Sequence, residues 1–143
     1  MTRGMTLIEV IISMAIMGIL TAAAAPLVGS LRDRYFVSAA ASEIASAHNR
    51  ARIQSVLQSR VVDLEVRPDS LFIRYGTGPG ATELWSSIGS ARNGVVMTSS
   101  SRTLSFAPTG VTLGFANASF VLTRGSARRQ VIISRLGRVR IIP

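Results

Sequence analysis

Residues 4–28 read GMTLIEVIISMAIMGILTAAAAPLV, and this stretch dominates the organisation of the 143-residue chain. No charged side chain lies between Val10 and Val28, a run of 19 residues. A helix of that length rises about 28 Å, which matches the hydrocarbon core of a bilayer. We therefore expect one membrane helix, followed by roughly 110 residues that are enough for a small soluble domain.

The apolar segment has two ordinary interpretations. It could be a plain membrane anchor, or a secretory signal with Arg3 as the charged start and Ala22–Ala24 as the cleavage site. Glu9 disfavours the signal because it places a charge within the apolar stretch. Pro26 also disfavours it, because a proline just beyond the small residues would hinder cleavage.

A third interpretation explains Glu9. A carboxylate in a membrane helix is costly and calls for a partner. If the chain is cut after Gly4, the new amine of Met5 lies about one helical turn from Glu9. Glu9 could then neutralise the amine of an adjacent subunit in an assembled bundle.

These residues resemble the leader motif of the type IV pilin and pseudopilin superfamily: a Gly, the cut, a hydrophobic residue, and a Glu at the fifth mature position. Gly4, Met5 and Glu9 match, Thr6–Ile8 fits the run between them, and Pro26 matches the helix-kinking proline. The resemblance implies that a prepilin peptidase cuts between Gly4 and Met5 and methylates the new amine. It also implies that the inner membrane holds the helix until the protein enters a filament with other major and minor pilins.

The expected domains are a prepilin leader at 1–4, a transmembrane and polymerisation helix at 5–29, and a periplasmic globular domain at 30–143. Within the last, an amphipathic helix is expected to about residue 58, ending near Leu57 to Ser59. Its apolar positions recur at three- and four-residue steps that would face a sheet: Val37, Ala40, Ala41, Ile44, Ala47 and Ala51.

Short strand-like segments with turn signals between them follow from Arg60 onward. They are 61–66, 71–75, 95–98, 102–106, 111–115, 120–124, 129–134 and 138–142. Repeated strands with short links predict an α+β fold, in which the long N-terminal helix packs on an antiparallel sheet in a pilin-like arrangement.

The chain offers little for catalysis. It has no cysteine and one histidine, His48, so neither a Cys-His pair nor a multi-histidine metal site can be built. Asp63 and Glu65 should share a solvated strand face, and Trp85 is either a core residue or a platform on which a base could stack. The loop Gly76–Gly80 lacks the Gly-Lys-Ser/Thr ending of a phosphate loop. We expect no enzyme activity, no cofactor and no metal.

Charge is distributed unevenly. The seven acidic residues all lie in the first 83 positions, whereas the segment from Leu84 to Pro143 has eight arginines and no acid, in a chain of net charge +9. This asymmetry indicates either a polyanionic partner or simply a basic soluble surface.

The C-terminal forty residues predict a three-strand meander. Arg138 and Arg140 are two apart and should share a face, with Val139 and Ile141 opposite. Their spacing of about 7 Å suits phosphates of a nucleic-acid backbone, contacted without sequence readout. Arginines on an edge strand also prevent aggregation, so both interpretations stay open.

A second resemblance bears on this choice. Three segments are similar to the GspH/FimT family. They are Ala45–Val62 with its Ala51-Arg52 pair, Phe106–Gly110, and the closing Gly137-Arg138-Val139-Arg140. The Gly-Arg-x-Arg ending resembles the DNA-binding motif of FimT-type minor pilins. The resemblance implies a minor type IV pilin that binds double-stranded DNA and assists its uptake in natural transformation. The implied DNA-binding residues are Arg138 and Arg140, with Gly137 in the motif and Arg135, Arg124, Arg128 and Arg129 in support.

The alternative is a GspH-like minor pseudopilin, a structural tip component of the type II secretion pseudopilus. It would share the leader, helix and sheet with the pilus protein. In either case the protein would be a substrate of processing enzymes and not itself an enzyme.

Overall fold

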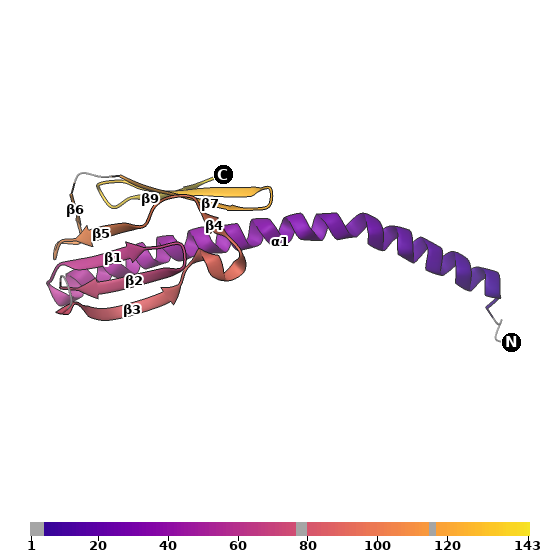
Figure 1. Ribbon diagram of the computed structural model, residues 1–143, viewed down its shortest axis with the longest axis horizontal. Helices are drawn as coiled ribbons and strands as arrows, with labels where there is room; N and C mark the ends of the chain where they lie inside the picture. The colour runs from indigo at the N-terminus through magenta and orange to yellow at the C-terminus, as the bar shows by residue number, and fades with distance from the viewer. Residues whose placement is uncertain (1–4, 77–79, 115–116) are drawn as a thin grey trace. The chain divides into compact units, whose positions relative to one another are not determined.

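A computed structural model describes residues 5–76, 80–114 and 117–143 of the chain. Gly4 of the leader motif, the centre of the Gly76–Gly80 loop and Phe115 at the end of a predicted strand lie outside these ranges. The chain divides into two compact units, Met1–Arg32 and Asp33–Pro143. The secondary structure consists of one long helix, one short 3-10 helix and nine strands within the described residues (Figure 1).

Helix α1 (Leu7–Gln58) begins just after Thr6, whose hydroxyl accepts a hydrogen bond from the amide of Glu9 at 3.4 Å. The helix continues through Pro26. An 18-residue window near the N-terminus has a mean hydropathy of 2.2 and none of it is buried, so α1 is long and apolar enough to cross a membrane. It ends within the range that the sequence predicts, where Ser59 adopts a positive φ of 50°.

Nine strands form two antiparallel sheets in the second unit. Sheet A has the order β3 (Thr82–Ile88), β2 (Ser70–Tyr75), β1 (Val62–Val66), β5 (Arg102–Phe106) and β6 (Thr112–Leu113). Sheet B has the order β4 (Val96–Met97), β7 (Ala118–Arg124), β8 (Ala127–Ile133) and β9 (Val139–Ile142). A 3-10 helix η2 (Ser90–Asn93) precedes β4.

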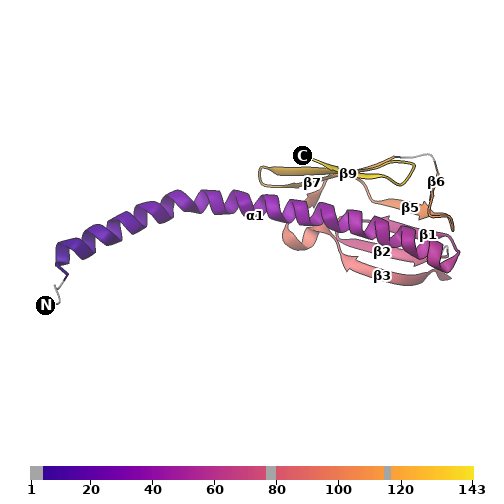
Figure 2. The same ribbon diagram turned by 180° about the vertical axis from the view of Figure 1, so that it is seen from behind.

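The core lies between the second half of α1 and both sheets. Figures 1 and 2 show sheet A covering one face of this part of the helix and sheet B lying along another side. All six residues of the predicted apolar stripe are buried, with exposed fractions of 0 to 6%. Four of the six are alanines, and their small side chains allow the strands to approach the helix closely. The largest fully buried side chains are Phe106 from sheet A and Phe120 from sheet B.

The expected α+β fold is confirmed, with two differences in detail. The strands form two sheets, whereas the sequence pattern predicts one. Strand β3 is missing from the expected strands because its sequence, TELWSSI, is rich in polar residues and does not alternate. It lies at the edge of sheet A, where no residue of the strand is fully buried, so no burial pattern is required of it.

Candidate functional site

Sheet B and its turns carry the arginines of the predicted DNA-binding set, and the register of the strands separates these arginines onto two faces. Directly paired residues of antiparallel strands point to the same face. Arg140 pairs with Ile132, and Arg128, four residues before Ile132 on the same strand, is therefore on that face too. The intervening residues Val131 and Ile133 are buried against the core. Arg128 and Arg140 consequently lie on the outer face of sheet B, and both are exposed.

Arg138 extends this outer face at the turn between β8 and β9. Its amide donates a hydrogen bond to the Ser134 hydroxyl at 3.1 Å, and its carbonyl accepts one from the Ser134 amide at 2.9 Å. Arg138 thus stands opposite Ser134, six residues from Arg128 along β8. The exposed row from Arg138 through Arg140 to Arg128 is therefore about 20 Å long, at roughly 3.3 Å per residue. We call Arg128, Arg138 and Arg140 the outer arginine row.

Gly137 makes the turn beside this row possible. Its φ of 77° lies in the left-handed region that favours glycine. A Cβ at this position would lie 4.0 Å from Arg52 Nη1 and from His48 Cε1, and 3.8 Å from Thr112 Oγ1. The β8–β9 turn therefore lies directly over side chains of α1 and β6. Arg135, also in this turn, is exposed, and its amide donates to Asn117 Oδ1 at 3.0 Å.

The guanidinium of Arg124 is engaged in internal contacts. Its Nε donates to Asp33 Oδ1 at 2.8 Å, and its Nη1 donates to the carbonyl of Asn93. The guanidinium carbon lies 4.6 Å from the centre of the Phe36 ring, and only 21% of the side chain is exposed. Arg124 pairs with Ala127, so it belongs to the inner face of sheet B and joins this sheet to α1.

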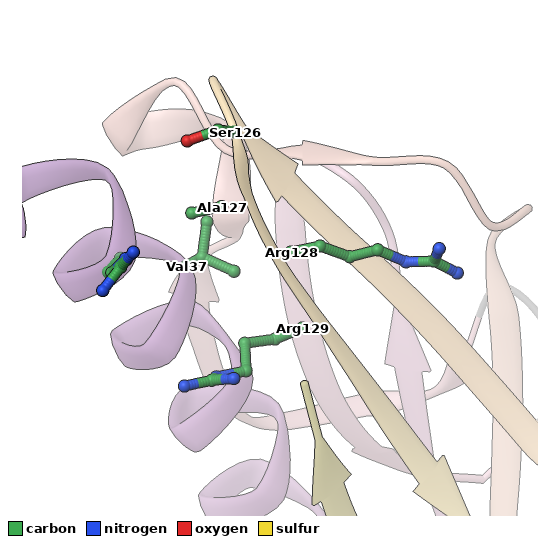
Figure 3. Close-up of a pocket in the computed structure, with 6 residues that line it drawn as sticks. Val37, Ser126, Ala127, Arg128 and Arg129 are labelled. Atoms are coloured by element: carbon green, nitrogen blue, oxygen red, sulfur yellow. The ribbon is translucent and has the colours of Figure 1, made fainter. Parts of the chain in front are cut away.

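Arg129 is also on the inner face, where it pairs with Leu122. Figure 3 shows its guanidinium next to α1, whereas the guanidinium of Arg128 points away on the other side of the strand. The cluster that the sequence places at one turn is thus divided. Arg128 belongs to the outer arginine row, and Arg124 and Arg129 face the helix.

Two buried polar side chains, His48 and Thr112, lie under the β8–β9 turn. His48 is fully buried, and its ring packs edge-on against Phe106 with centroids 5.1 Å apart. Among the described residues, His48 Nε2 and Thr112 Oγ1 have no hydrogen-bond partner. Burial lowers the pKa of His48; its contact with Asn49 opposes that change, and the nearby charge of Arg52 lowers the pKa further. The side chain is therefore a packed, neutral core histidine.

Glu65 and Trp85 are engaged in local contacts, whereas Asp63 Oδ1 is buried and has no hydrogen-bond partner among the described residues, so this carboxylate is not simply solvated as expected. Glu65 Oε1 accepts a hydrogen bond from Arg67 Nε at 2.7 Å, and Glu65 Oε2 lies 3.5 Å from Arg74 Nη1, so this carboxylate is part of an ion-paired strand face. Trp85 is half-buried under the guanidinium of Arg50, 5.0 Å from the ring centre, and that face of the ring is not an open platform. Within the described ranges, no three His, Asp or Glu side chains come together as metal ligands.

Two basic residues near these sites were not among the predicted site residues. Arg34 of α1 shares a pocket with Arg129, and Arg52 reaches the β8–β9 turn. Both contacts join positions more than 80 residues apart in the chain. The Ala51-Arg52 pair is noticed in the sequence, but nothing there indicates that Arg52 approaches Gly137.

Comparison with known protein families gives two matches. Residues 1–25 match the prokaryotic N-terminal methylation motif, and residues 40–137 match type II transport protein GspH. The chain belongs to the GspH family. A GspH-type chain that also carries the methylation motif is a member of the type IV pilin and pseudopilin superfamily, as the leader resemblance implies.

Individual relatives agree with this family. The chain is 30% identical over 156 residues to the pilin-like protein PilA1 of Thermus thermophilus, and the match covers 97% of each chain. Two crystal structures of the type IV minor pilin FimU of Pseudomonas aeruginosa share its fold. The first has a TM-score of 0.63 at 20% identity and covers 77% of this chain and 90% of its own. The second has a TM-score of 0.57 at 19% identity and covers 74% of this chain and 92% of its own.

The GspH-type chain is therefore a single-pass inner-membrane protein of the pilin class. The methylation motif, the apolar half of α1 and the β-rich second unit together fit insertion in the membrane followed by incorporation into a filament. Families of this class are structural, and their members are processed by a prepilin peptidase and assemble with other pilins.

Proposed function

We propose that this protein is a minor pilin that binds double-stranded DNA through the outer arginine row and assists DNA uptake in natural transformation. The main support is the convergence of Arg128, Arg138 and Arg140 on one exposed face of sheet B. Within the described residues, none of these three guanidinium groups has a carboxylate or carbonyl partner. No acidic residue follows Glu83 in the chain.

Unpaired, exposed arginines at this spacing suit a phosphate backbone. A guanidinium offers a planar, bidentate donor pair to phosphate oxygens. A row of about 20 Å spans roughly three phosphate intervals of one strand at about 7 Å each. Contacts of this type release counterions and carry no base readout, so binding should be salt-dependent and indifferent to sequence.

Arg135 and Gly137 remain part of the proposed DNA surface, Arg135 as an exposed residue of the turn and Gly137 as the residue that shapes it. Arg124 and Arg129 face α1, so we propose structural or separate roles for them. Arg52 lies under the same turn and adds its charge to that end of the surface.

The processing part of the proposal rests on the methylation motif. We infer that a prepilin peptidase cuts between Gly4 and Met5 and that the new amine of Met5 is methylated. Glu9 is inferred to pair with the amine of a neighbouring subunit during assembly. By the same inference the leader is 1–4, the polymerisation helix is 5–29 and the periplasmic domain is 30–143.

The DNA-binding proposal is tested with the full chain in phosphatidylcholine nanodiscs, titrated against labelled duplex DNA at several salt concentrations. The variant Arg138→Gln/Arg140→Gln should lose about tenfold in affinity per arginine, since a hydrogen bond to a charged group contributes about 1.5 kcal/mol. The log–log salt slope should become shallower by about 1 per arginine.

The matched control is Arg60→Gln/Arg92→Gln, which removes the same charge from exposed arginines outside sheet B. Unchanged binding by the control and weakened binding by the test variant would support the outer arginine row. Equal losses in both variants would reduce the proposal to a general effect of net charge.

A second candidate function is a minor pseudopilin of type II secretion that contacts other proteins. A shallow apolar pocket of about 460 Å³ at the end of α1 favours it, and Asn49, Arg52, Ile53, Val56 and Leu57 line this pocket. Ile53, Val56 and Leu57 are 50 to 71% exposed. Absence of DNA binding even at low salt would favour this second function, and the arginines would then protect the edge of sheet B or contact proteins.

A further inference from the structure

A second basic site lies on the inner side of sheet B. Arg34 and Val37 of α1, together with Ser126, Ala127, Arg128 and Arg129, line a pocket of about 260 Å³ (Figure 3). Because the guanidinium of Arg128 points away from this side, the basic groups of the pocket are those of Arg34 and Arg129. We call this pocket the arginine notch. One water takes about 30 Å³, so the notch has room for a phosphate group and several waters.

The notch carries uncompensated positive charge. No acidic side chain is among its lining residues. The neighbouring carboxylate of Asp33 is neutralised by Arg124 at 2.8 Å. In the part of the chain that the structure describes, neither Arg34 nor Arg129 has a carboxylate, carbonyl or aromatic partner. Two like charges facing one pocket repel each other, and an anion between them would turn that repulsion into attraction.

The chemistry of the lining groups favours a phosphate. Each guanidinium can donate two parallel hydrogen bonds to phosphate oxygens, and the exposed hydroxyl of Ser126 can donate another. The buried side chains of Val37 and Ala127 form an apolar wall beneath these donors. This mixture of apolar wall and cationic donors suits a phosphodiester that carries organic substituents better than a fully hydrated inorganic ion.

The position of Arg34 in the chain indicates where such a phosphate would come from. Val28 is the last residue of the charge-free run, and Arg34 follows it by six residues. Six residues rise about 9 Å in a helix, and the polar layer on each side of a bilayer is about 5 to 8 Å thick. Arg34 is therefore within side-chain reach of the headgroups that border the membrane segment.

The same arginine departs from the usual distribution of charge around a membrane helix. Lysine and arginine normally accumulate in the cytoplasmic flank. Here the periplasmic flank itself begins with Arg32 and Arg34. Anionic lipid in the periplasmic leaflet would offset this charge.

We propose that the arginine notch binds the phosphate of an anionic phospholipid, such as phosphatidylglycerol, in the periplasmic leaflet. The bound lipid holds the second unit at the membrane surface before assembly. The phosphate must leave when the subunit is extracted into a filament, so the site is a weak and reversible one. This inference is independent of the proposed DNA function, because it uses Arg34 and Arg129 and not the outer arginine row.

The test uses the full chain, reconstituted in nanodiscs of equal parts phosphatidylcholine and phosphatidylglycerol. After release into mild detergent, native mass spectrometry measures the ratio of the two lipids retained. The wild type should retain phosphatidylglycerol preferentially. Arg34→Gln/Arg129→Gln should lower that preference about 25-fold, since each arginine near an anionic surface contributes about a factor of five.

Three comparisons complete the design. Arg138→Gln/Arg140→Gln removes the same charge outside the notch and should retain the lipid like the wild type. Ser126→Asp leaves both notch arginines in place but adds an anion at the rim, and it should also lose the lipid. Thermal unfolding is measured by Trp85 fluorescence, and unchanged midpoints establish that the variants are folded.

Equal retention of phosphatidylglycerol by the wild type and the Arg34/Arg129 variant would overturn the inference. Binding of inorganic phosphate in phosphatidylcholine nanodiscs, with no preference for phosphatidylglycerol, would make the notch a free-phosphate site and also overturn it. If the Arg34/Arg129 variant loses duplex DNA as strongly as the Arg138/Arg140 variant, the notch belongs to the DNA surface. Failure of DNA binding with intact lipid preference would overturn the proposed function and leave this inference standing.

Discussion

Arg124 is expected to be a structural residue whose removal destabilises the second unit and leaves DNA binding unchanged. Its ion pair with Asp33 is partly exposed, with 21% and 27% of the two side chains accessible, so we assign it about 1 kcal/mol. Its position 4.6 Å from the Phe36 ring adds about 0.5 to 1 kcal/mol. Arg124→Gln should therefore cost about 2 kcal/mol, and at roughly 4 °C per kcal/mol the thermal midpoint should fall by about 8 °C.

A double-mutant cycle with Asp33→Asn isolates the ion pair. The full chain in detergent micelles is unfolded with urea, and the fluorescence of Trp85, the one tryptophan of the chain, reports the transition. The two single variants and the double variant should give a coupling energy of about 1 kcal/mol. DNA affinity of Arg124→Gln should stay within twofold of wild type. A coupling near zero, or a loss of DNA affinity as large as that of Arg140→Gln, would refute the structural role.

Three further predictions address packing, pH and assembly. Gly89→Ala should lower the free energy of unfolding by about 1 to 3 kcal/mol, because the new Cβ would lie 2.6 to 2.9 Å from backbone atoms of residues 68–70. The control Gly80→Ala should be neutral in the same urea titration, because a Cβ at that position meets nothing within 4 Å. Burial lowers the pKa of His48 in the folded protein below about 6.5, the ordinary value that applies in the unfolded chain. The stability that the neutral ring contributes is therefore present above about pH 6.5 and is lost as the pH falls below that value. The thermal midpoint of the wild type should drop more steeply on acidification than the midpoint of His48→Gln. Parallel acid profiles would contradict this. Glu9→Ala should still be cleaved at the leader but should be depleted from sheared filaments in immunoblots, and normal incorporation would remove the charge-pairing argument.

The helix and most strands could be predicted because their signals are local. The alanine-rich stripe of α1 recurs at helical spacing, and all its members are buried. The meander of β7, β8 and β9 follows from alternating apolar residues and from turn glycines such as Gly125 and Gly137. Each of these patterns lies within a short segment, so no knowledge of long-range pairing is needed.

The division of strands into two sheets could not be predicted in this way. Sheet A pairs β1 with β5, whose residues are about 40 positions apart, and sheet B pairs β4 with β7 across β5 and β6. Such pairings depend on how both sheets share the surface of α1. No residue of strand β3 is fully buried, so its sequence needs no alternation of apolar and polar residues and resembles that of a loop.

The candidate site was partly accessible from the sequence. The shared face of Arg138 and Arg140 follows from their spacing, but the positions of the other arginines depend on register. Arg128 and Arg129 are neighbours in sequence and point to opposite faces. Asp33, the ion-pair partner of Arg124, lies on α1 more than 90 residues earlier, as do the helix residues that share a pocket with Arg129. Only the folded structure brings these residues together.

A salt titration tests whether the outer arginine row binds the phosphate backbone of DNA. Binding of duplex DNA to the full chain in phosphatidylcholine nanodiscs is measured for the wild type and for Arg138→Gln/Arg140→Gln. Binding to the phosphate backbone should give the wild type a steep log–log salt slope, and the slope should become shallower by about 2 in the variant. The loss of affinity should be the same for duplexes of different sequence. Identical affinities and slopes for the two proteins, or no binding of either at low salt, would contradict binding through this row.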